Sequence, residues 1–326
     1  MIIRLIVSLA ATLVASTAWA NDKVIFATNW LAQGGHGGFY QALADGTYEK
    51  YGLEVDIQMG GPQMNNRPML PAGKVDFLMT GNLLLSMDSV RNEIPTIVVA
   101  SYFEKDPQAI IAHKGQYSGW DELANAPEIL VSKDGQFSFW KWMTAEHGFK
   151  DESLRPYGYN LAAFLNDEKM VQQAYGTAEP IYAAAAGANV ETYLLADQGW
   201  NTYSTTIEAR VDMVKNNPDL VQRFIDASTV GWYNYLYGDN AAGNAAIISA
   251  NPDQTLEKLA KEAMQLKSLG IIDSGNQLEV GIGAIDMARV RAFYELAVEA
   301  GILAVSYTHL RAHETLRYLV CRLLLE

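Results

Sequence analysis

The sequence predicts an α/β fold, because short strand-like segments alternate with segments that carry apolar residues at helical spacing. The first strand is expected at residues 23–28, where K-V-I-F-A-T is rich in β-branched and aromatic residues. Residues 39–50 follow with helical spacing, and L-E-V-D-I at residues 53–57 then alternates apolar and polar side chains. Further strands are expected at residues 74–79 and, fully buried, at residues 94–102.

A glycine-rich segment, T-N-W-L-A-Q-G-G-H-G-G-F-Y at residues 28–40, joins the first strand to the first helix. Its four glycines let the backbone approach a bound group closely, and the following helix presents unsatisfied N–H groups. Trp30, His36 and Tyr40 add stacking faces and a titratable donor. The glycine spacing does not match G-x-G-x-x-G, so it does not predict a dinucleotide site. A ligand site and a purely structural turn both remain open.

The same alternation continues along the rest of the chain. Strands are expected at residues 108–113, 128–132, 154–159 and 202–209. Helices are expected at residues 137–147, 163–175, 210–215, 220–237, 240–250, 254–269 and 284–300. The aromatic residues around Trp232 fit packing into a core better than a cofactor site.

Composition narrows the classes of function. The chain has 24 Lys and Arg against 37 Asp and Glu, a formal charge of -13, which disfavours nucleic acid as a partner. Hydrophobic residues make up 49% of the chain, as expected for a well-packed globular protein. Cys321 is the only cysteine, so no intramolecular disulfide is expected and stability must come from core burial.

The N-terminus has the pattern of a secretory signal peptide. Arg4 precedes an apolar run from Leu5 to Val14, and small residues then end in Ala18-Trp19-Ala20. Cleavage is expected after Ala20. A membrane anchor is the alternative, but the apolar run is shorter than the roughly 20 residues that span a bilayer.

Several motifs together resemble a known family. T-N-W, His36 and G-F-Y are followed by a helix ending G-x-Y-x-x-x-G-L-x-V-x-I, which is similar to the opening of the solute-binding proteins of ABC importers. The group in question handles nitrate, sulfonates and thiamine-pyrimidine precursors. The resemblance runs over residues 23–304 and continues in these segments: G-G-P at 60–62, A-G-K-V-D-F at 72–77, I-P-T-I-V-V-A at 94–100 and N-P-D-L-V-Q-R-F at 217–224.

The resemblance implies a two-lobe periplasmic binding protein of type II-like fold. Each lobe would be a mixed sheet flanked by helices, with a small planar solute bound in the cleft between the lobes. It also implies a periplasmic monomer that delivers its solute to an ABC permease in the cytoplasmic membrane. No cofactor, metal site, catalytic residue or nucleic-acid partner is expected.

The resemblance also implies how the chain divides. The first lobe would contain residues 21–112 and 203–304, and the second lobe residues 113–202, with a hinge near His113 and Tyr203. Residues 305–326 do not fit the family and resemble translated sequencing-adapter read-through, so we expect a non-native tail. His309 and His313 in this tail have a spacing that metal ligands use, but we predict no metal site there.

Ligand-binding residues are expected at several points in this cleft. Trp30, His36 and Tyr40 come from the glycine-rich segment, and Asn82 follows the third strand, where it either contacts ligand or caps the next helix. In T-A-E-P-I-Y at residues 177–182, Glu179 should face the cleft with Tyr182 stacking beside it. A carboxylate suits an amine or amino-substituted heterocycle and does not suit nitrate. A plain helix start at Glu179, before a proline, is the alternative.

An enzyme of the same fold family is the rival interpretation. The thiamine-pyrimidine synthase is similar in T-N-W, the early histidine and G-K-V-D, but it carries a cofactor-binding lysine and a histidine shortly afterwards. Those positions are Thr80 and Leu84 here, and the cysteine-rich run of that enzyme is missing. The sequence therefore predicts a binding protein, of the thiamine-precursor type or of the nitrate and sulfonate type.

Overall fold

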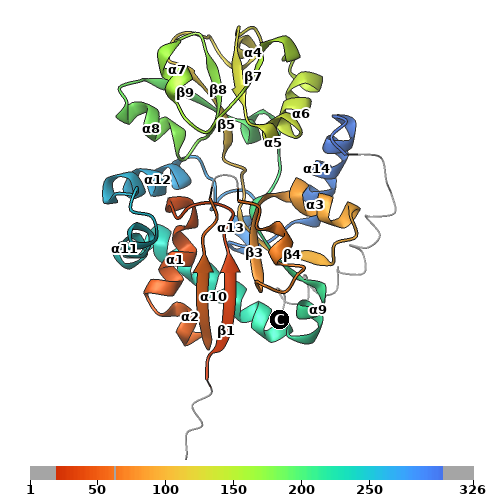
Figure 1. Cartoon of the computed structure of the whole chain (residues 1–326), viewed down its shortest axis with the longest axis vertical. Coiled ribbons are helices and arrows are strands. Elements are labelled where there is room, and N and C mark those ends of the chain that lie inside the picture. The colour runs from red at the N-terminus through yellow and green to blue at the C-terminus, as the bar shows by residue number, and fades with distance from the viewer. Residues whose placement is uncertain (1–19, 62–63, 304–326) are drawn as a thin grey trace, which may run out of the picture.

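The computed structural model describes residues 20–61 and 64–303, which form two five-stranded mixed sheets (Figure 1). The first sheet has the order β2-β1-β3-β10-β4; β1 is parallel to β2 and β3, and β10 is antiparallel to β3 and β4. Its strands are β1 (Asp22–Ala27), β2 (Leu53–Gln58), β3 (Phe77–Asn82), β4 (Thr96–Phe103) and β10 (Ser204–Arg210).

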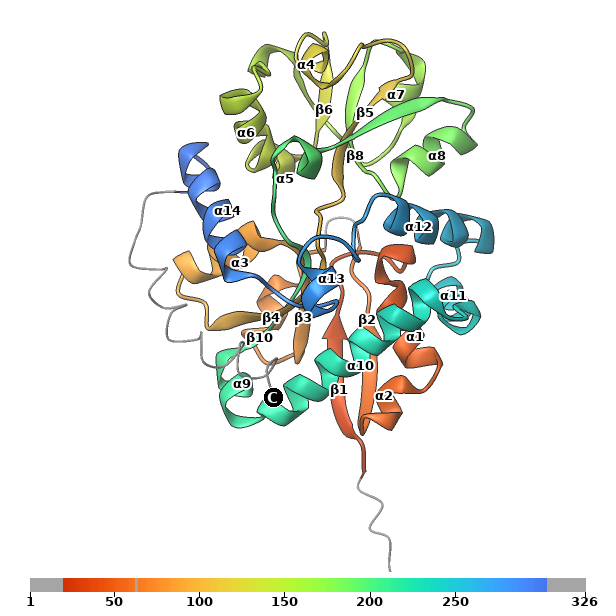
Figure 2. The ribbon, with the colours of Figure 1, turned by 180° about the vertical axis from the view of Figure 1, so that it is seen from behind.

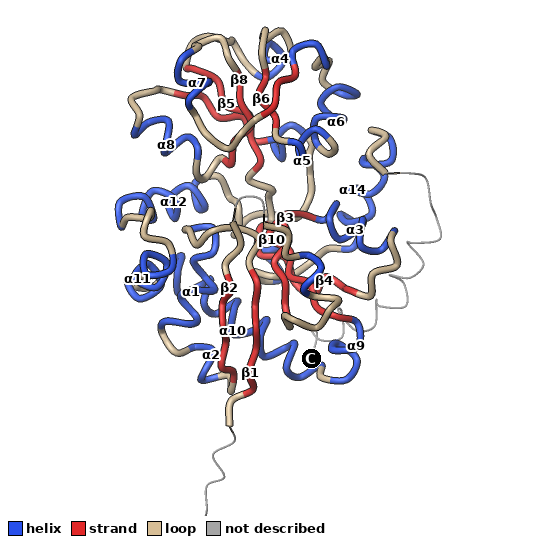
Figure 3. Tube along the Cα trace, in the orientation of Figure 1, coloured by secondary structure: helices blue, strands red, loops and turns tan. Residues whose placement is uncertain are grey.

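The second sheet has the order β7-β6-β8-β5-β9, and β6 is parallel to β7 and β8 while β5 is antiparallel to β8 and β9. Its strands are β5 (Gln108–His113), β6 (Ile129–Val131), β7 (Leu154–Pro156), β8 (Val171–Tyr175) and β9 (Val190–Leu194). We call the two sheets with their surrounding helices the first lobe and the second lobe; Figure 3 shows them one above the other. This is the predicted two-lobe α/β architecture.

Helices flank both sheets (Figures 1 and 2). Around the first sheet lie η1 (Gly34–His36), α1 (Gly37–Ala44), α2 (Thr47–Lys50), η2 (Arg67–Met69), α3 (Leu83–Arg91), α9 (Val211–Asn216), α10 (Pro218–Tyr237), α11 (Ala241–Ala250), α12 (Leu256–Ser268), α13 (Gln277–Val280) and α14 (Met287–Glu299). Around the second sheet lie α4 (Trp120–Leu123), α5 (Lys133–Gln136), α6 (Phe139–Glu146), η3 (Asp151–Ser153), α7 (Ala162–Asn166), α8 (Glu179–Ala185) and η4 (Leu195–Gln198).

The core of the first lobe is built on a close approach of α1 to α10. A Cβ on Gly231 of α10 would lie 2.2 Å from the carbonyl oxygen of Gly38 in α1, so only glycine fits there. Gly38 in turn lies against the ring of Trp232, and that indole is fully buried against Phe39. The glycine-rich segment thus ends in a packed helix pair that fixes the start of α1. Trp232 and Tyr235 belong to the core as predicted, whereas Tyr233 and Tyr237, on the other face of α10, are exposed.

The chain crosses between the lobes twice. After β4 the residues from Glu104 to Pro107 lead into β5, and after η4 the residues from Gly199 to Tyr203 lead back into β10. The sequence placed the first crossing near His113, but β5 pairs with β8 and β9 in the second sheet. We therefore propose that the second lobe begins at residue 108, while Tyr203 marks the return crossing.

One expected helix is wrong in its second half. Within residues 163–175, α7 ends at Asn166, and residues 171–175 form β8 inside the second sheet. The side chain of Asp167 accepts a hydrogen bond from the backbone N–H of Lys169 at 2.9 Å, which favours a turn over continued helix. Val171 and Gln172 are fully buried, so sheet pairing decides the conformation of this segment.

Within residues 20–61 and 64–303, no helix is both long enough and apolar enough to cross a bilayer. Residues 1–19 of the predicted signal peptide and the whole predicted non-native tail lie outside these ranges.

Candidate functional site in the interlobe cleft

Aromatic rings from both lobes meet across the cleft. Trp30 lies beyond the carboxyl end of β1 in the first lobe, and its ring centroid is 5.6 Å from that of Tyr159 in the second lobe. The ring of Tyr159 is in turn 5.2 Å from that of Tyr157. Tyr159 is 53% exposed and has a left-handed backbone with φ of 57°. An exposed aromatic ring held in a sparsely populated conformation is typical of a ligand-contacting position.

Glu179 lies beside the aromatic rings of Tyr157 and Tyr159. It begins α8, so the helix-start alternative describes its backbone correctly. Its side chain nevertheless points to the tyrosines: Oε2 accepts a hydrogen bond from the backbone N–H of Tyr175 at 2.7 Å, and Oε1 accepts one from the Tyr157 hydroxyl at 3.3 Å. Burial raises the pKa of the Glu179 carboxyl, and these hydrogen bonds oppose the rise.

A second carboxyl, which is fully buried, lies on the first crossing between the lobes. Asp106 is fully buried, and burial raises its pKa to about 7. Its Oδ2 accepts a hydrogen bond from Asn82 Nδ2 at 3.4 Å, and its Oδ1 accepts one from the backbone N–H of Gln108 at 3.2 Å. Burial also raises the pKa of the Tyr175 phenol, with added contributions from the nearby Asp106 and Glu179 charges. Tyr175 is therefore close enough to both carboxyls for their charges to affect its phenol.

Asn82 has the capping role, one of the two alternatives that the sequence left open. Its Oδ1 accepts a hydrogen bond from the backbone N–H of Leu84 at 3.1 Å and so caps α3. Its Nδ2 is directed to Asp106 at the crossing. The capping contact fixes the side chain beside the candidate site, and a ligand contact by Asn82 stays a prediction.

His36 and Tyr40 are more deeply buried than the other candidates. His36 is 2% exposed within η1, and burial lowers the pKa of its imidazole to about 4. Its Nδ1 has no hydrogen-bond partner among residues 20–61 and 64–303. Tyr40 is part of the hydrophobic core of the first lobe, and burial raises the pKa of its phenol to about 12. Both support the glycine-rich segment from within, and direct ligand contact by either stays a prediction.

Tyr182 contacts the opposite lobe. Its hydroxyl donates a hydrogen bond to Oε1 of Glu262 on α12 at 3.2 Å, and the ammonium of Lys258 lies 5.6 Å from its ring centroid. Tyr182 follows Glu179 by one turn of α8. The same short helix therefore carries the carboxyl at the aromatic group and a direct bridge between the lobes.

The charge of the site is acidic. In the part of the chain that the structure describes, neither Glu179 nor Asp106 forms an ion pair with a lysine or arginine. Carboxyls without a cationic partner, one of them fully buried, favour a ligand that brings hydrogen-bond donors or positive charge. No group of metal-ligating side chains is found in the same residues, and the His309–His313 pair lies outside them.

A cavity of about 400 Å³ lies elsewhere, between α6 and α14. It is lined by Trp142, Glu146, His147, Gln198, Gly199, Ala292, Glu295, Leu296 and Glu299. His147 Nδ1 already accepts a hydrogen bond from the Trp120 indole at 3.0 Å, so this cavity offers no free imidazole on that side. We propose the candidate site between the two lobes, because aromatic rings and carboxyls from separate elements converge there.

Sequence reasoning missed Tyr157, Tyr159, Tyr175 and Asp106. The first two follow β7 directly in R-P-Y-G-Y-N, where polar and aromatic residues after a strand are a usable signal. The expected strand at residues 154–159 hid that signal, because it placed both tyrosines inside the strand. Tyr175 ends β8, which was expected as helix.

Comparisons with known proteins agree with this architecture. A family model described as NMT1/THI5 like matches residues 33–239. The riboflavin-binding protein RibY of Chloroflexus aurantiacus is 22% identical over 275 residues, which cover 82% of this chain and 77% of RibY. The match spans most of both chains.

Two solved structures illustrate the range of the fold. The periplasmic aliphatic sulphonate binding protein SsuA of Escherichia coli superposes with a TM-score of 0.61 at 12% identity, covering 85% of each chain. The desulfurization enzyme DSZB superposes with a TM-score of 0.57 at 13% identity, covering 90% of this chain and 100% of its own. At these identities the likeness shows the fold alone.

Proposed function

The chain belongs to the NMT1/THI5 like family, and we propose that it is the extracytoplasmic solute-binding component of an ABC importer. The single observation that carries the proposal is the convergence of Trp30 from one lobe with Tyr159 from the other, beside the carboxyl of Glu179. Such a site is complete only when the lobes are together. The predicted signal peptide supports a periplasmic location, and the implied partner is a permease in the cytoplasmic membrane.

The two lobes close on a solute because both lobes contribute contacts to it. A planar solute stacked on Trp30 and Tyr159 gains contacts from both lobes only in the closed arrangement, so binding shifts the population toward that state. The permease then meets a closed, loaded protein. This mechanism requires binding and release and no bond-breaking step.

The chemistry of the cleft favours an amino-substituted heterocycle, of the thiamine-pyrimidine type. The rings supply stacking faces, and Glu179 accepts hydrogen bonds from an exocyclic amino group. The buried Asp106 adds a second acidic group near Tyr175. Nitrate and sulfonates are anions, and, among the described residues, neither Glu179 nor Asp106 is paired with a lysine or arginine that could bind an anion.

Two other functions exist on this fold. SsuA binds aliphatic sulphonates, and DSZB is a desulfurization enzyme. Neither is favoured here, because the cleft residues that converge are aromatic and acidic. RibY is a riboflavin-binding protein, and an isoalloxazine is also planar, so riboflavin belongs among the solutes to be tested.

A thermal-shift screen of the protein from Asn21 onward tests the proposal. The panel contains aminopyrimidines, thiamine, riboflavin, taurine, alkanesulfonates, nitrate and polyamines. A solute that binds only the folded state stabilises it by about 2.7 kcal/mol at a hundredfold excess over its Kd. A rise in Tm with an aminopyrimidine, and recovery of that solute unchanged, supports the proposal. A rise only with sulfonate or nitrate keeps the binding protein and discards the role of Glu179. Conversion of a panel solute to product overturns it in favour of an enzyme.

A further inference from the structure

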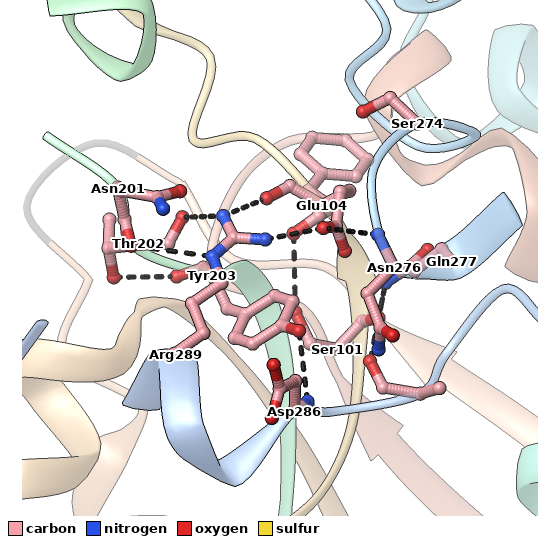
Figure 4. Close-up of polar contacts among 12 residues, drawn as sticks. Ser101, Glu104, Asn201, Thr202, Tyr203, Ser274, Asn276, Gln277, Asp286 and Arg289 are labelled. Atoms are coloured by element: carbon pink, nitrogen blue, oxygen red, sulfur yellow. Dashed lines mark hydrogen bonds and ion pairs between the residues drawn. The ribbon is translucent and has the colours of Figure 1, made fainter. Parts of the chain in front are cut away.

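Arg289 joins the two segments that connect the lobes (Figure 4). It lies in the first turn of α14, more than eighty residues from either segment along the chain. Its Nη1 donates to Oε1 of Glu104 at 2.6 Å, on the first crossing. Its Nη2 donates to the carbonyl oxygen of Glu104 and also to that of Thr202, on the second crossing, at 3.2 Å. One guanidinium therefore holds both crossings.

Further contacts fix the guanidinium in this place. Its carbon lies 4.1 Å from the ring centroid of Tyr203, and its Nε donates to the carbonyl oxygen of Asn201 at 3.4 Å. The side chains of Arg289 and Glu104 are only 12% and 5% exposed. A planar guanidinium with donors on several sides suits this arrangement, and a lysine ammonium cannot reach all of these acceptors.

Glu104 is also held from another direction. Its Oε1 accepts a hydrogen bond from the backbone N–H of Asn276 at 3.1 Å. Its Oε2 is buried and has no hydrogen-bond partner among the described residues. Burial raises the pKa of this carboxyl, and the charge of Arg289 opposes the rise. Loss of the guanidinium would leave a buried carboxyl without its cation, so the pair is sensitive to substitution.

The helix that carries Arg289 reaches from the crossings to the second lobe. The backbone N–H of Asp286, just before α14, donates to the Tyr203 hydroxyl at 3.0 Å. Farther along α14, the ring centroid of Phe293 is 5.0 Å from that of Trp200, and the ammonium of Lys141 on α6 donates to the carbonyl oxygen of Gly301 at 3.4 Å. Any change in the angle between the lobes must therefore move these contacts relative to one another.

We infer that Arg289 is a positioning residue for solute binding: by tying both crossings to α14, it favours the arrangement in which the aromatic rings of the two lobes meet. The inference rests on the proposed function, because it assigns the lobe angle a role in affinity. Loss of the tie lowers the population of the binding-competent state, and the apparent Kd rises in proportion.

The test compares Arg289→Gln and Arg289→Lys with Arg223→Gln as a matched control. Arg223 also bridges distant segments, through Asp22 at 2.6 Å and Asp219 at 2.8 Å, but all of these lie within the first lobe. Dyes on cysteines at the exposed positions Glu54 and Lys114, in the Cys321→Ser background, report the distance between the lobes by energy transfer. The solute that gives the largest thermal shift is used to measure Kd.

We expect Arg289→Gln to lengthen or broaden the interlobe distance in the ligand-free protein and to raise Kd about tenfold, within the usual span of coupling between sites. Arg289→Lys keeps the positive charge, so its changes in interlobe distance and in Kd should be smaller than those of Arg289→Gln. If the glutamine variant does not fold, the lysine variant still tests the inference. Arg223→Gln should change Tm alone. The inference is overturned if the Arg289 variants lose stability but keep the distance distribution and Kd of the parent.

The distance measurement separates this inference from the proposed function. If no panel solute binds the parent protein, the proposed function fails, while the ligand-free interlobe distance still decides the role of Arg289. An unchanged distance in both Arg289 variants rejects that role.

Discussion

The hydroxyl of Tyr182 in the second lobe donates a hydrogen bond to Oε1 of Glu262 in the first lobe, at 3.2 Å. The other oxygen of the same carboxyl accepts the backbone N–H of Gly34 at 2.5 Å. Glu262 thereby connects α8 to the glycine-rich segment of residues 28–40, which contains Trp30. Since Glu179 lies one turn from Tyr182 on α8, the position of this helix affects both the interlobe bridge and the candidate site.

Replacement of Glu179 should weaken binding of an amino-substituted heterocycle. A hydrogen bond to a charged group contributes about 1.5–3 kcal/mol, so Glu179→Ala should raise Kd by roughly 10- to 100-fold, as measured by calorimetry. Glu179→Gln, which keeps one acceptor oxygen, should lose less. Glu168→Gln, at an exposed position of the second lobe, is the control and should leave Kd unchanged. Equal affinity of the parent and the alanine variant would remove Glu179 from the site.

Removal of either aromatic ring at the cleft should also weaken binding. An aromatic pair contributes about 0.5–1.5 kcal/mol beyond its buried area, so Trp30→Ala or Tyr159→Ala should raise Kd by roughly threefold or more. Quenching of tryptophan fluorescence by a planar solute should disappear in the Trp30 variant. Tyr233→Ala removes another exposed ring, 44% exposed on α10, and should alter neither signal. Retained quenching without Trp30 would argue against stacking at this residue.

Gly231→Ala should destabilise the first lobe. The added Cβ would lie 2.2 Å from the Gly38 carbonyl oxygen and 2.6 Å from the Ala42 Cβ, so α1 and α10 must separate. Overpacking of this kind costs about 1–3 kcal/mol. Urea denaturation should show a lower midpoint than for the parent. Gly119→Ala, where no atom lies within 4 Å of the added Cβ, should unfold at the parent midpoint.

The pH dependence of stability should change when Glu262 is replaced by glutamine. Burial raises its pKa from 4.5 to about 7. Between these values the unfolded chain is ionised while the folded protein holds the proton, so the stabilising contribution of Glu262 is full below pH 4.5 and is lost as the pH rises to about 7. The parent should therefore lose stability relative to Glu262→Gln across this window, as followed by denaturation at several pH values.

Other groups near Glu262 also affect the pH dependence of stability, so they must be the same in the parent and in Glu262→Gln. The backbone N–H of Gly34 and the side chains of Glu179, Tyr182, Tyr235 and Lys258 influence or contact Glu262. Asp106, with its pKa also raised to about 7, contributes stability that falls as the pH rises. His36, with its pKa lowered to about 4, contributes stability that increases as the pH rises. Because both remain in the parent and the variant, their contributions cancel in the difference. A difference that is flat from pH 4.5 to 7 would contradict the assignment.

Local sequence patterns are sufficient to predict several features of this fold. The strand at residues 23–28, the glycine-rich join and the long helix of residues 220–237 all appear where periodicity placed them, with shifts of one or two residues at their ends. The helix start at Glu179 was likewise foreseen from the following proline, as the alternative to a ligand contact. These signals need only neighbouring residues, so one chain suffices to find them.

Tertiary structure alone decided which distant residues meet. Residues 171–175 are a strand because they pair with β5 and β6, and no local periodicity reports that pairing. Burial of His36 and Tyr40 depends on helices more than a hundred residues away. Arg289 contacts Glu104 across 185 residues, and both are polar side chains that local patterns place at the surface. Burial of such a pair is stable only where the fold supplies both partners together, and this is why only the folded chain reveals it.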